Sequence, residues 1–450
     1  MSGLRPAIRR TGATAGQRRS VGFASLGLVL FLIAMRAPIG IVLLLVSFVG
    51  VWSATGFQVA WGMARAIPFD FIANWSFSAV PMFLLMGFIA SNGGLTSGLF
   101  DAMRIVLRRV PGGPACAGVG ACALFSAASG SSVATSAAMS RIAVPEMLKA
   151  GYDKALATGT IASAGTLGSL IPPSILMIVY GIFAQVSVGK LFLAGFIPGA
   201  LSTIMYMSMI MIRAKLNPKL APTIDYNPPR EERIQAFKEV WPLPTLILGV
   251  LGGIFFGVMT PTEAGAVGAS IAMLIAAFRR TLTLAVIKAA VRDAAIGTST
   301  IFIIAVGATM FTAFLGLTGV PRVISGAMLS IASDKYTLIV MIAVIYVLLG
   351  MFIEGIGIML LTLPIIYPLL QQANVDMIWF GIIVVKLLEI GMVTPPVGLN
   401  CYVISSSLKG VAPLSTVFRG AFAFVLTDLV TLALLIAFPI ITLWLPNIAG

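Results

Sequence analysis

Two proline pairs, Pro172-Pro173 and Pro395-Pro396, interrupt long apolar stretches of this 450-residue chain. They constrain its fold more than any other feature. Each proline removes a backbone donor and breaks the helical hydrogen-bond ladder. In a hydrocarbon layer, such a break persists only where it is buried in protein or lines a polar cavity. Two breaks in corresponding halves of a chain point to the midplane binding site of a secondary transporter.

The composition predicts an all-α, multi-pass membrane protein surrounded by the lipid bilayer. Hydrophobic residues make up 59% of the chain, charged residues make up 10%, and the mean hydropathy is +1.05. No soluble domain has this balance. The formal charge of +14 lies mainly in short connections. There, lysine and arginine mark cytoplasmic loops, so no nucleic-acid partner is expected.

The chain lacks several residues and motifs on which enzymes commonly depend. It contains no histidine, which removes the commonest general base and metal ligand. Cys116, Cys122 and Cys401 form no CxxC or metal-binding spacing and are interpreted as small buried hydrophobes. No Walker A loop is present. We therefore expect no enzymatic activity, no cofactor and no transition-metal site.

The N-terminus combines a basic tail with an apolar run. Residues 1–20 carry five arginines and no acid, which predicts a cytoplasmic tail. The run that follows could be a signal peptide or a first membrane helix. The helix is favoured because no small-x-small cleavage site follows, and because Arg36 and Pro38 lead directly into another apolar run.

A polar linker divides the chain near its middle. Residues 213–240 hold four prolines and charges of both signs, between a first half, 21–212, and a second half, 241–450. The apolar stretches predict about 11 or 12 full spans plus re-entrant hairpins. Segment 57–75 mixes aromatic and charged residues, which predicts an interfacial helix.

The two halves have prolines, a glycine and an aspartate at matching positions, at an offset of 223 residues. Pro145 matches Pro368, Asp153 matches Asp376, and Gly168 matches Gly391, as do both proline pairs. Few other identities survive. This agreement predicts an internal structural repeat, and an odd number of spans per half would make it inverted.

The first half contains a predicted hairpin, 114–148, and a broken helix, 155–186. Small and hydroxyl residues fill the hairpin around Ser129-Gly130-Ser131-Ser132. They could serve close helix packing. Alternatively, this tip could reach the midplane, where carbonyl and hydroxyl oxygens would suit a small cation and a helix N-terminus would suit an anion.

The second half repeats this arrangement with a hairpin, 336–370, and a broken helix, 377–408. Its tip contains Glu354, which is costly in a membrane unless it is paired, protonated or bound to a cation. Lys386 and Glu389 are three residues apart and could form an ordinary helix-end pair or a functional one. Glu263 follows a proline at a helix start, where a capping role is favoured over a ligand role.

Five motifs resemble the large, DctM-like membrane subunit of tripartite ATP-independent periplasmic (TRAP) transporters. They occur in order between Pro38 and the LWLP near the C-terminus. The motifs are SGSSVATSAAMSRIAVPEMLKAGYDKA, GTLGSLIPPSILMIVYG, KLFLAGFIPGAL, MTPTEAGAVGA and IGMVTPPVGLN. The resemblance implies two inverted repeats in the bacterial inner membrane and an elevator-type mechanism. It also implies Na⁺-coupled uptake of an organic acid, usually a carboxylate. The implied partners are a periplasmic substrate-binding protein and a small four-helix membrane subunit.

The resemblance also assigns candidate site residues. The cation ligands are Gly130, Ser131, Ser132 and Gly168 at one site, and Glu354, Gly355, Gly391, Thr394 and Pro395 at the other. The substrate-binding candidates are Ser129, Thr135, Pro173, Ser174 and Asn400. Many members of the family carry an aspartate where this chain has Glu354, which indicates a subfamily with a different substrate.

Three other functions remain as alternatives. A stand-alone ion-coupled carboxylate carrier would need no binding protein. An ion channel usually places its filter on a symmetry axis between several chains, so the repeat within one chain disfavours it. A membrane-embedded enzyme would need a nucleophile with its base, or a metal cluster, and the chain offers neither.

Overall fold

The computed structural model describes residues 15–35, 37–96, 98–222, 228–332 and 334–448. Most of the basic tail, residues 1–14, lies outside the described residues, as does Arg36. Residues 15–20 of the predicted tail already belong to helix α1, Ala15–Ala34.

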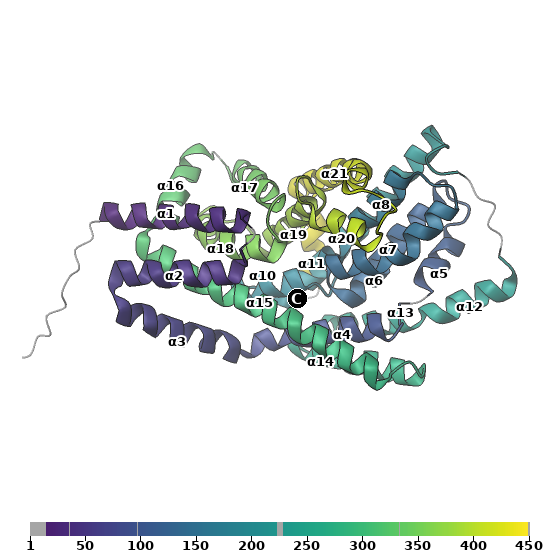
Figure 1. Cartoon of the computed structure of the whole chain (residues 1–450), viewed down its shortest axis with the longest axis horizontal. Helices are drawn as coiled ribbons and strands as arrows, with labels where there is room; N and C mark the ends of the chain where they lie inside the picture. Colours follow the sequence, from purple (N-terminus) through teal and green to yellow (C-terminus); the bar gives the residue numbers. More distant parts are fainter. Residues whose placement is uncertain (1–14, 36, 97, 223–227, 333, 449–450) are drawn as a thin grey trace, which may run out of the picture. The chain divides into compact units, whose positions relative to one another are not determined.

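Helices connected by short turns make up the described parts of the chain, and these parts contain no β-strand (Figure 1). After α1, the helices of the first half are α2 Ile39–Thr55, α3 Phe57–Ala73, η1 Trp75–Ser78, α4 Ala79–Asn92, α5 Leu99–Val106, α6 Gly113–Ser129, α7 Ser132–Lys149, α8 Lys154–Ala164, α9 Leu167–Leu170, α10 Ile175–Phe183 and α11 Val188–Leu216. Those of the linker and second half are α12 Arg230–Val240, α13 Pro242–Phe255, α14 Pro261–Phe278, α15 Leu284–Thr318, α16 Val320–Ile331, α17 Lys335–Gly350, α18 Gly355–Gln372, α19 Met377–Val393, α20 Leu399–Ser407, α21 Leu414–Ala437 and α22 Ile440–Ile448.

Nine helical segments among the described residues are long and apolar enough to cross a membrane. Four further apolar helices have 10 to 17 residues, and α6 of the first hairpin is one of them. The sequence led us to expect about 11 or 12 full spans. Long apolar stretches are instead divided into shorter helices at the predicted breaks.

Two compact units divide the chain, and both draw on both sequence halves. One contains residues 15–74, 300–332 and 360–371 among those described. Within this unit, α2 packs closely on the second part of α15. A Cβ added to Gly40 would lie 2.8 Å from the carbonyl carbon of Ile303, so only glycine permits this approach. Most of segment 57–75 is helical as α3, Phe57–Ala73, and Phe69 and Trp61 on it are exposed.

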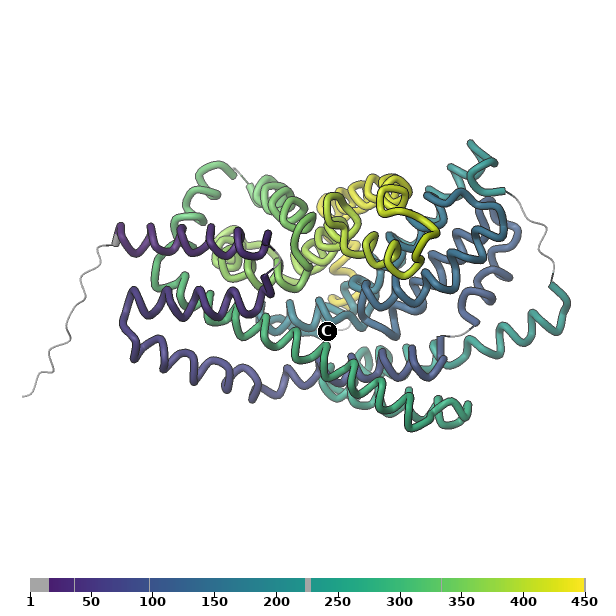
Figure 2. The backbone as a smooth tube through the Cα atoms, in the orientation of Figure 1, coloured from purple at the N-terminus to yellow at the C-terminus, as the bar shows by residue number. Residues whose placement is uncertain are grey.

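The larger unit contains residues 75–299, 334–359 and 372–448, with the gaps noted above. Helices from distant parts of the chain pack together in it: α8, in blue, lies beside α21, in yellow (Figure 2). Helix α21 also packs on α19 and α11. All the candidate site residues of both sequence halves belong to this unit.

Local capping explains where several of these helices begin. The Asp153 and Asp376 carboxylates accept backbone N–H bonds at the starts of α8 and α19, at 2.9 Å from Leu156 and 2.8 Å from Ile378. The 223-residue offset therefore matches two equivalent N-caps. Thr260 and Glu263 form a reciprocal capping box at the start of α14, which confirms the structural role predicted for Glu263.

Candidate functional site

The first predicted hairpin is present as α6 and α7, joined by a two-residue turn. Gly130 ends α6 with φ +61°, a left-handed conformation that glycine adopts without penalty. Ser131 is extended and caps α7, where its hydroxyl accepts a bond from the Ala134 N–H at 3.4 Å. The turn therefore projects one helix N-terminus and the Ser131 carbonyl from the same point.

Ion pairs fix the opposite end of α7. Glu146 contacts Arg104 on α5 at 3.2 Å and Lys149 at 2.8 Å. The hydrogen bond from Lys149, together with the nearby charge of Arg104, lowers the pKa of Glu146. Glu146 is partly exposed, so this anchor contributes little free energy, and it mainly fixes the hairpin's direction.

The first break separates α8, α9 and α10. Residues 171–174 leave the helix, and the Pro172-Pro173 bond is cis. The Ser174 hydroxyl donates to the Ser169 carbonyl at 2.5 Å and accepts from the Met177 N–H at 3.4 Å. Ser174 therefore bridges the two sides of the break. The predicted interruption at this proline pair is confirmed.

The first hairpin tip contacts the first break through its backbone. A Cβ added to Gly168 would lie 2.7 Å from the Ser131 carbonyl oxygen, and one added to Gly130 would lie 2.7 Å from that of Pro173. The Ile175 N–H donates to the Gly130 carbonyl at 3.2 Å. Two glycines thus let an extended segment and a broken helix approach within contact distance, and carbonyl oxygens from both converge there.

The second break shows the same relationship. Helix α19 ends at Val393 and α20 begins at Leu399, with a second cis bond between Pro395 and Pro396. A Cβ on Gly391 would lie 2.6 Å from the Gly350 Cα at the end of α17. Beyond the break, the Val397 N–H donates to the Met351 carbonyl at 3.2 Å. The α17–α18 turn therefore faces this break, as the first tip faces the first.

The two breaks differ in exposure. Pro172, Pro173 and Ser174 are buried, whereas Pro395 and Pro396 are exposed. The Glu354 side chain is also exposed, while Gly355 beside it is buried and packs near the Leu388 side chain. The Thr394 hydroxyl donates to the Ile390 carbonyl at 2.6 Å and keeps its lone pairs for another partner.

Four of the five substrate candidates gather around the first tip. Ser129 and Thr135 share a 2.8 Å hydroxyl contact, and Pro173 and Ser174 lie in the adjoining break. Asn400 lies instead against α8, where its Nδ2 donates to the Ala162 carbonyl at 3.3 Å. The Asn400 Oδ1 is buried and has no hydrogen-bond partner among the described residues. It is thus an acceptor available to a donor from a ligand.

Oxygen atoms dominate both candidate cation sites. Carbonyl and hydroxyl oxygens are hard ligands that suit a small cation of the alkali or alkaline-earth type. In the described part of the chain, no group of three or more Cys, Asp or Glu side chains is placed to hold a metal. The available donors therefore fit Na⁺ better than a transition metal.

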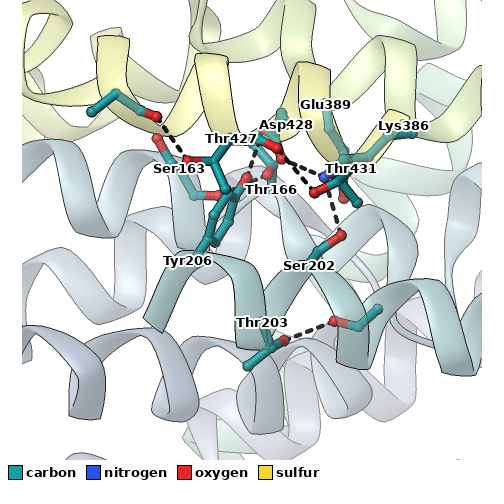
Figure 3. Close-up of polar contacts among 12 residues, drawn as sticks. Ser163, Thr166, Ser202, Thr203, Tyr206, Lys386, Glu389, Thr427, Asp428 and Thr431 are labelled. Carbon is teal, nitrogen blue, oxygen red and sulfur yellow. Dashed lines mark hydrogen bonds and ion pairs between the residues drawn. The ribbon is translucent and has the colours of Figure 1, made fainter. Parts of the chain in front are cut away.

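A buried charge cluster joins α19 and α21 and is formed by Lys386, Glu389 and Asp428 (Figure 3). The Lys386 ammonium lies 3.0 Å from Glu389 Oε2 and 2.5 Å from Asp428 Oδ1, and all three side chains are 0% exposed. Lys386 also donates to the Ser202 hydroxyl at 3.2 Å. Tyr206 donates to Asp428 Oδ2 at 2.6 Å.

Sequence reasoning found two of the three residues of this cluster. The spacing correctly paired Lys386 with Glu389, but the interpretation as an ordinary helix-end pair is wrong because both side chains are fully buried within α19. Asp428 and Tyr206 were missed. The available signal was Asp428 itself, the only charged residue in the apolar stretch 420–448. An intramembrane ionisable residue of this kind normally has a function.

Comparisons with known proteins agree with this architecture. Residues 26–441 match the family model described as "Tripartite ATP-independent periplasmic transporter, DctM component". The chain is 36% identical to the C4-dicarboxylate TRAP transporter large permease protein DctM of Pseudomonas aeruginosa, over 85% of this chain and 88% of that protein. It is 33% identical to the sialic acid TRAP transporter permease SiaT of Haemophilus influenzae, over 82% of this chain and 59% of that longer protein.

A solved structure shares the fold. The YdaH transporter of Alcanivorax borkumensis, reported to have an unusual topology, superposes with a TM-score of 0.57 and 13% identity, covering 84% of this chain and 89% of that one. Together with the family match, the nine candidate membrane helices among the described residues identify a multi-pass permease of the inner membrane. The chain belongs to the DctM family of large TRAP transporter permeases.

Proposed function

We propose that this chain is the transporting subunit of a Na⁺-coupled uptake system for an organic acid. A periplasmic substrate-binding protein delivers the acid, and a small four-helix membrane subunit packs beside the chain. The observation that carries the proposal is the contact of each hairpin tip with one broken helix, at Gly168 and at Gly391. These contacts bring backbone oxygens together where helical hydrogen bonding is interrupted.

The cation ligands follow from those contacts. The first Na⁺ would be held by oxygens of Gly130, Ser131, Ser132 and Gly168. The second would be held by those of Gly355, Gly391, Thr394 and Pro395, with Glu354 close by. Unwound carbonyls in broken helices are the usual Na⁺ ligands of secondary transporters.

The substrate class is supported by chemistry and by relatives. The N-terminus of α7 at Ser131 and Ser132 presents backbone N–H groups that favour an anion. The names of the related permeases specify C4-dicarboxylate, sialic acid and isethionate, all of which are organic acids. We therefore assign an anionic substrate to the first tip, near Ser129, Thr135, Pro173 and Ser174, with Asn400 as an amide contact.

Coupling follows from charge balance. An organic anion in a low-dielectric site is costly unless a cation lies close to it, so Na⁺ and substrate should each strengthen the binding of the other. In an elevator mechanism, the part of the chain that holds the substrate and Na⁺ moves as one body across the membrane. The close-packed α8, α19 and α21 in the larger unit support such a body.

Reconstitution tests the assignment of partners. The chain and its small membrane subunit are reconstituted in proteoliposomes, and the loaded binding protein is added to the external solution. We expect uptake only when all three proteins are present. Uptake of free substrate at the same rate without the binding protein would identify a stand-alone carrier instead.

A further inference from the structure

In the cluster of Lys386, Glu389 and Asp428, two carboxylates share a single ammonium. No other charged side chain in the described part of the chain forms an ion pair with these three. Hydroxyls of Ser202 and Tyr206 complete the contacts but add no charge. The ionised cluster therefore has a formal charge of −1.

Complete burial makes that charge significant. All three side chains are 0% exposed, so water neither solvates nor screens them. The Oε1 atom of Glu389 has no hydrogen-bond partner in the described residues. A buried carboxylate oxygen without a partner is costly, and a nearby positive charge is the natural compensation.

The cluster lies on the helix that leads into the second break. Glu389 precedes Gly391 by two residues and Thr394 by five, or roughly 3 to 8 Å along a helix axis. The proposed cation ligands there are carbonyl and hydroxyl oxygens, which are neutral. Glu354 is the one acid at the tip, and its side chain is exposed and forms no ion pair with the described residues.

We propose that the Lys386–Glu389–Asp428 cluster supplies the countercharge for the cation at the second break. This inference rests on the proposed Na⁺ site and assigns a positioning role to residues that do not ligate the ion. Lys386 holds the two carboxylates together and limits the excess to a single charge. The cluster then attracts one monovalent cation to neutral ligands that would otherwise bind it weakly.

Coulomb's law gives the expected size of the effect on Na⁺ affinity. Unit charges about 10 Å apart, at an effective dielectric constant of about 20, attract strongly enough to change an affinity by roughly tenfold. Asp428→Asn makes the cluster neutral and keeps an oxygen that can accept the Tyr206 bond. We therefore expect the Na⁺ concentration for half-maximal binding to rise by about tenfold in this variant.

A double variant distinguishes the effect of the charge from the effect of lost contacts. Lys386→Gln combined with Asp428→Asn leaves Glu389 as the only carboxylate and removes more of the native contacts. Because a buried carboxylate without a counterion favours its protonated form, the variants are compared at about pH 9, where Glu389 can ionise and give a net charge of −1. We expect the half-maximal Na⁺ concentration of the double variant to return to within about threefold of the parent. A purely structural role predicts the opposite, because the double variant should then be impaired at least as much as the single one.

The measurement uses the purified complex with its small membrane subunit. Na⁺ is titrated at constant ionic strength against choline, and thermal stabilisation reports binding without a known substrate. Glu389→Gln, and Glu389→Gln with Lys386→Gln, repeat the test should Asp428→Asn fail to fold. Neutral single variants that bind Na⁺ like the parent, or double variants that do not recover, would overturn the countercharge. A parent complex that shows no Na⁺-specific stabilisation would overturn the proposed Na⁺ site itself.

Discussion

The Ser132 hydroxyl lies 3.2 Å from the sulfur of Met392, which is 260 residues further along the chain. Ser132 is at the first hairpin tip, and Met392 directly follows the glycine at which the second broken helix meets α17. The first tip therefore contacts both breaks: the first through Gly168 and the second through Met392. Residues of the first tip therefore border both proposed cation sites, so a cation bound at one site should affect cation binding at the other.

The close approach at Gly168 predicts a severe effect of a single methyl group. In Gly168→Ala, the new Cβ would lie 2.7 Å from the Ser131 carbonyl oxygen, and backbone atoms on both sides cannot move aside cheaply. We expect Na⁺-dependent uptake to fall at least tenfold. The matched control is Gly252→Ala on α13, where no atom lies within 4 Å of the new Cβ. Equal activity of the two variants would contradict the contact.

Two substitutions of Thr394 distinguish the role of its hydroxyl from that of its methyl group. The hydroxyl proton is used in the bond to Ile390, which leaves oxygen lone pairs for a cation. Thr394→Ala should raise the Na⁺ concentration for half-maximal uptake severalfold, whereas Thr394→Ser should stay near the parent. The Na⁺ dependence of uptake in proteoliposomes measures both. Similar shifts in the two variants would assign the effect to packing.

Ser131 offers a parallel test at the first site. Its hydroxyl caps α7 with a long bond of 3.4 Å, so its loss should cost little stability. We expect Ser131→Ala to raise the Na⁺ requirement while the melting temperature of the Na⁺-free complex changes only slightly. An unchanged Na⁺ dependence for both Ser131→Ala and Thr394→Ala would show that the cation sites are assigned to the wrong residues.

Neutralising an exposed acid should change the Na⁺ requirement less than neutralising a buried one. Glu354→Gln removes the charge of an exposed side chain near the second site, and we expect the Na⁺ requirement to rise by less than about threefold. Asp428→Asn removes a charge from a fully buried cluster and should have the larger effect. Both are measured in the same titration. The reverse order would make Glu354 the principal countercharge.

Glu146 gives a pH prediction for the base of the first hairpin. Because Lys149 and Arg104 hold its pKa below the ordinary value, the ionised form stabilises the fold at neutral pH. This stabilisation is lost as the pH falls through the lowered pKa. Glu146→Gln should therefore lower the thermal stability slightly at pH 7, by less than about 1 kcal/mol. The difference from the parent should vanish in acid, and a difference that persists there would indicate another cause.

The sequence predicts those features that depend on local chemistry. Proline pairs, N-cap aspartates and the Thr260–Glu263 capping box act within a few residues, so the breaks and helix starts were predictable. The charge cluster was not, because Asp428 meets Lys386 and Tyr206 only when α21, α19 and α11 pack together. The exposure of Pro395 and the burial of Pro172 are likewise tertiary properties, although each proline pair follows a glycine by four residues.

Ion dependence of uptake tests the proposed coupling most directly. The chain, its small membrane subunit and the loaded binding protein are reconstituted, and radiolabelled organic acid is followed under an inward Na⁺ gradient or an equal K⁺ gradient. We predict accumulation with Na⁺, little or none with K⁺, and loss of accumulation when an ionophore dissipates the Na⁺ gradient. Equal accumulation with K⁺ would contradict sodium coupling and, with it, the assignment of the two breaks as Na⁺ sites.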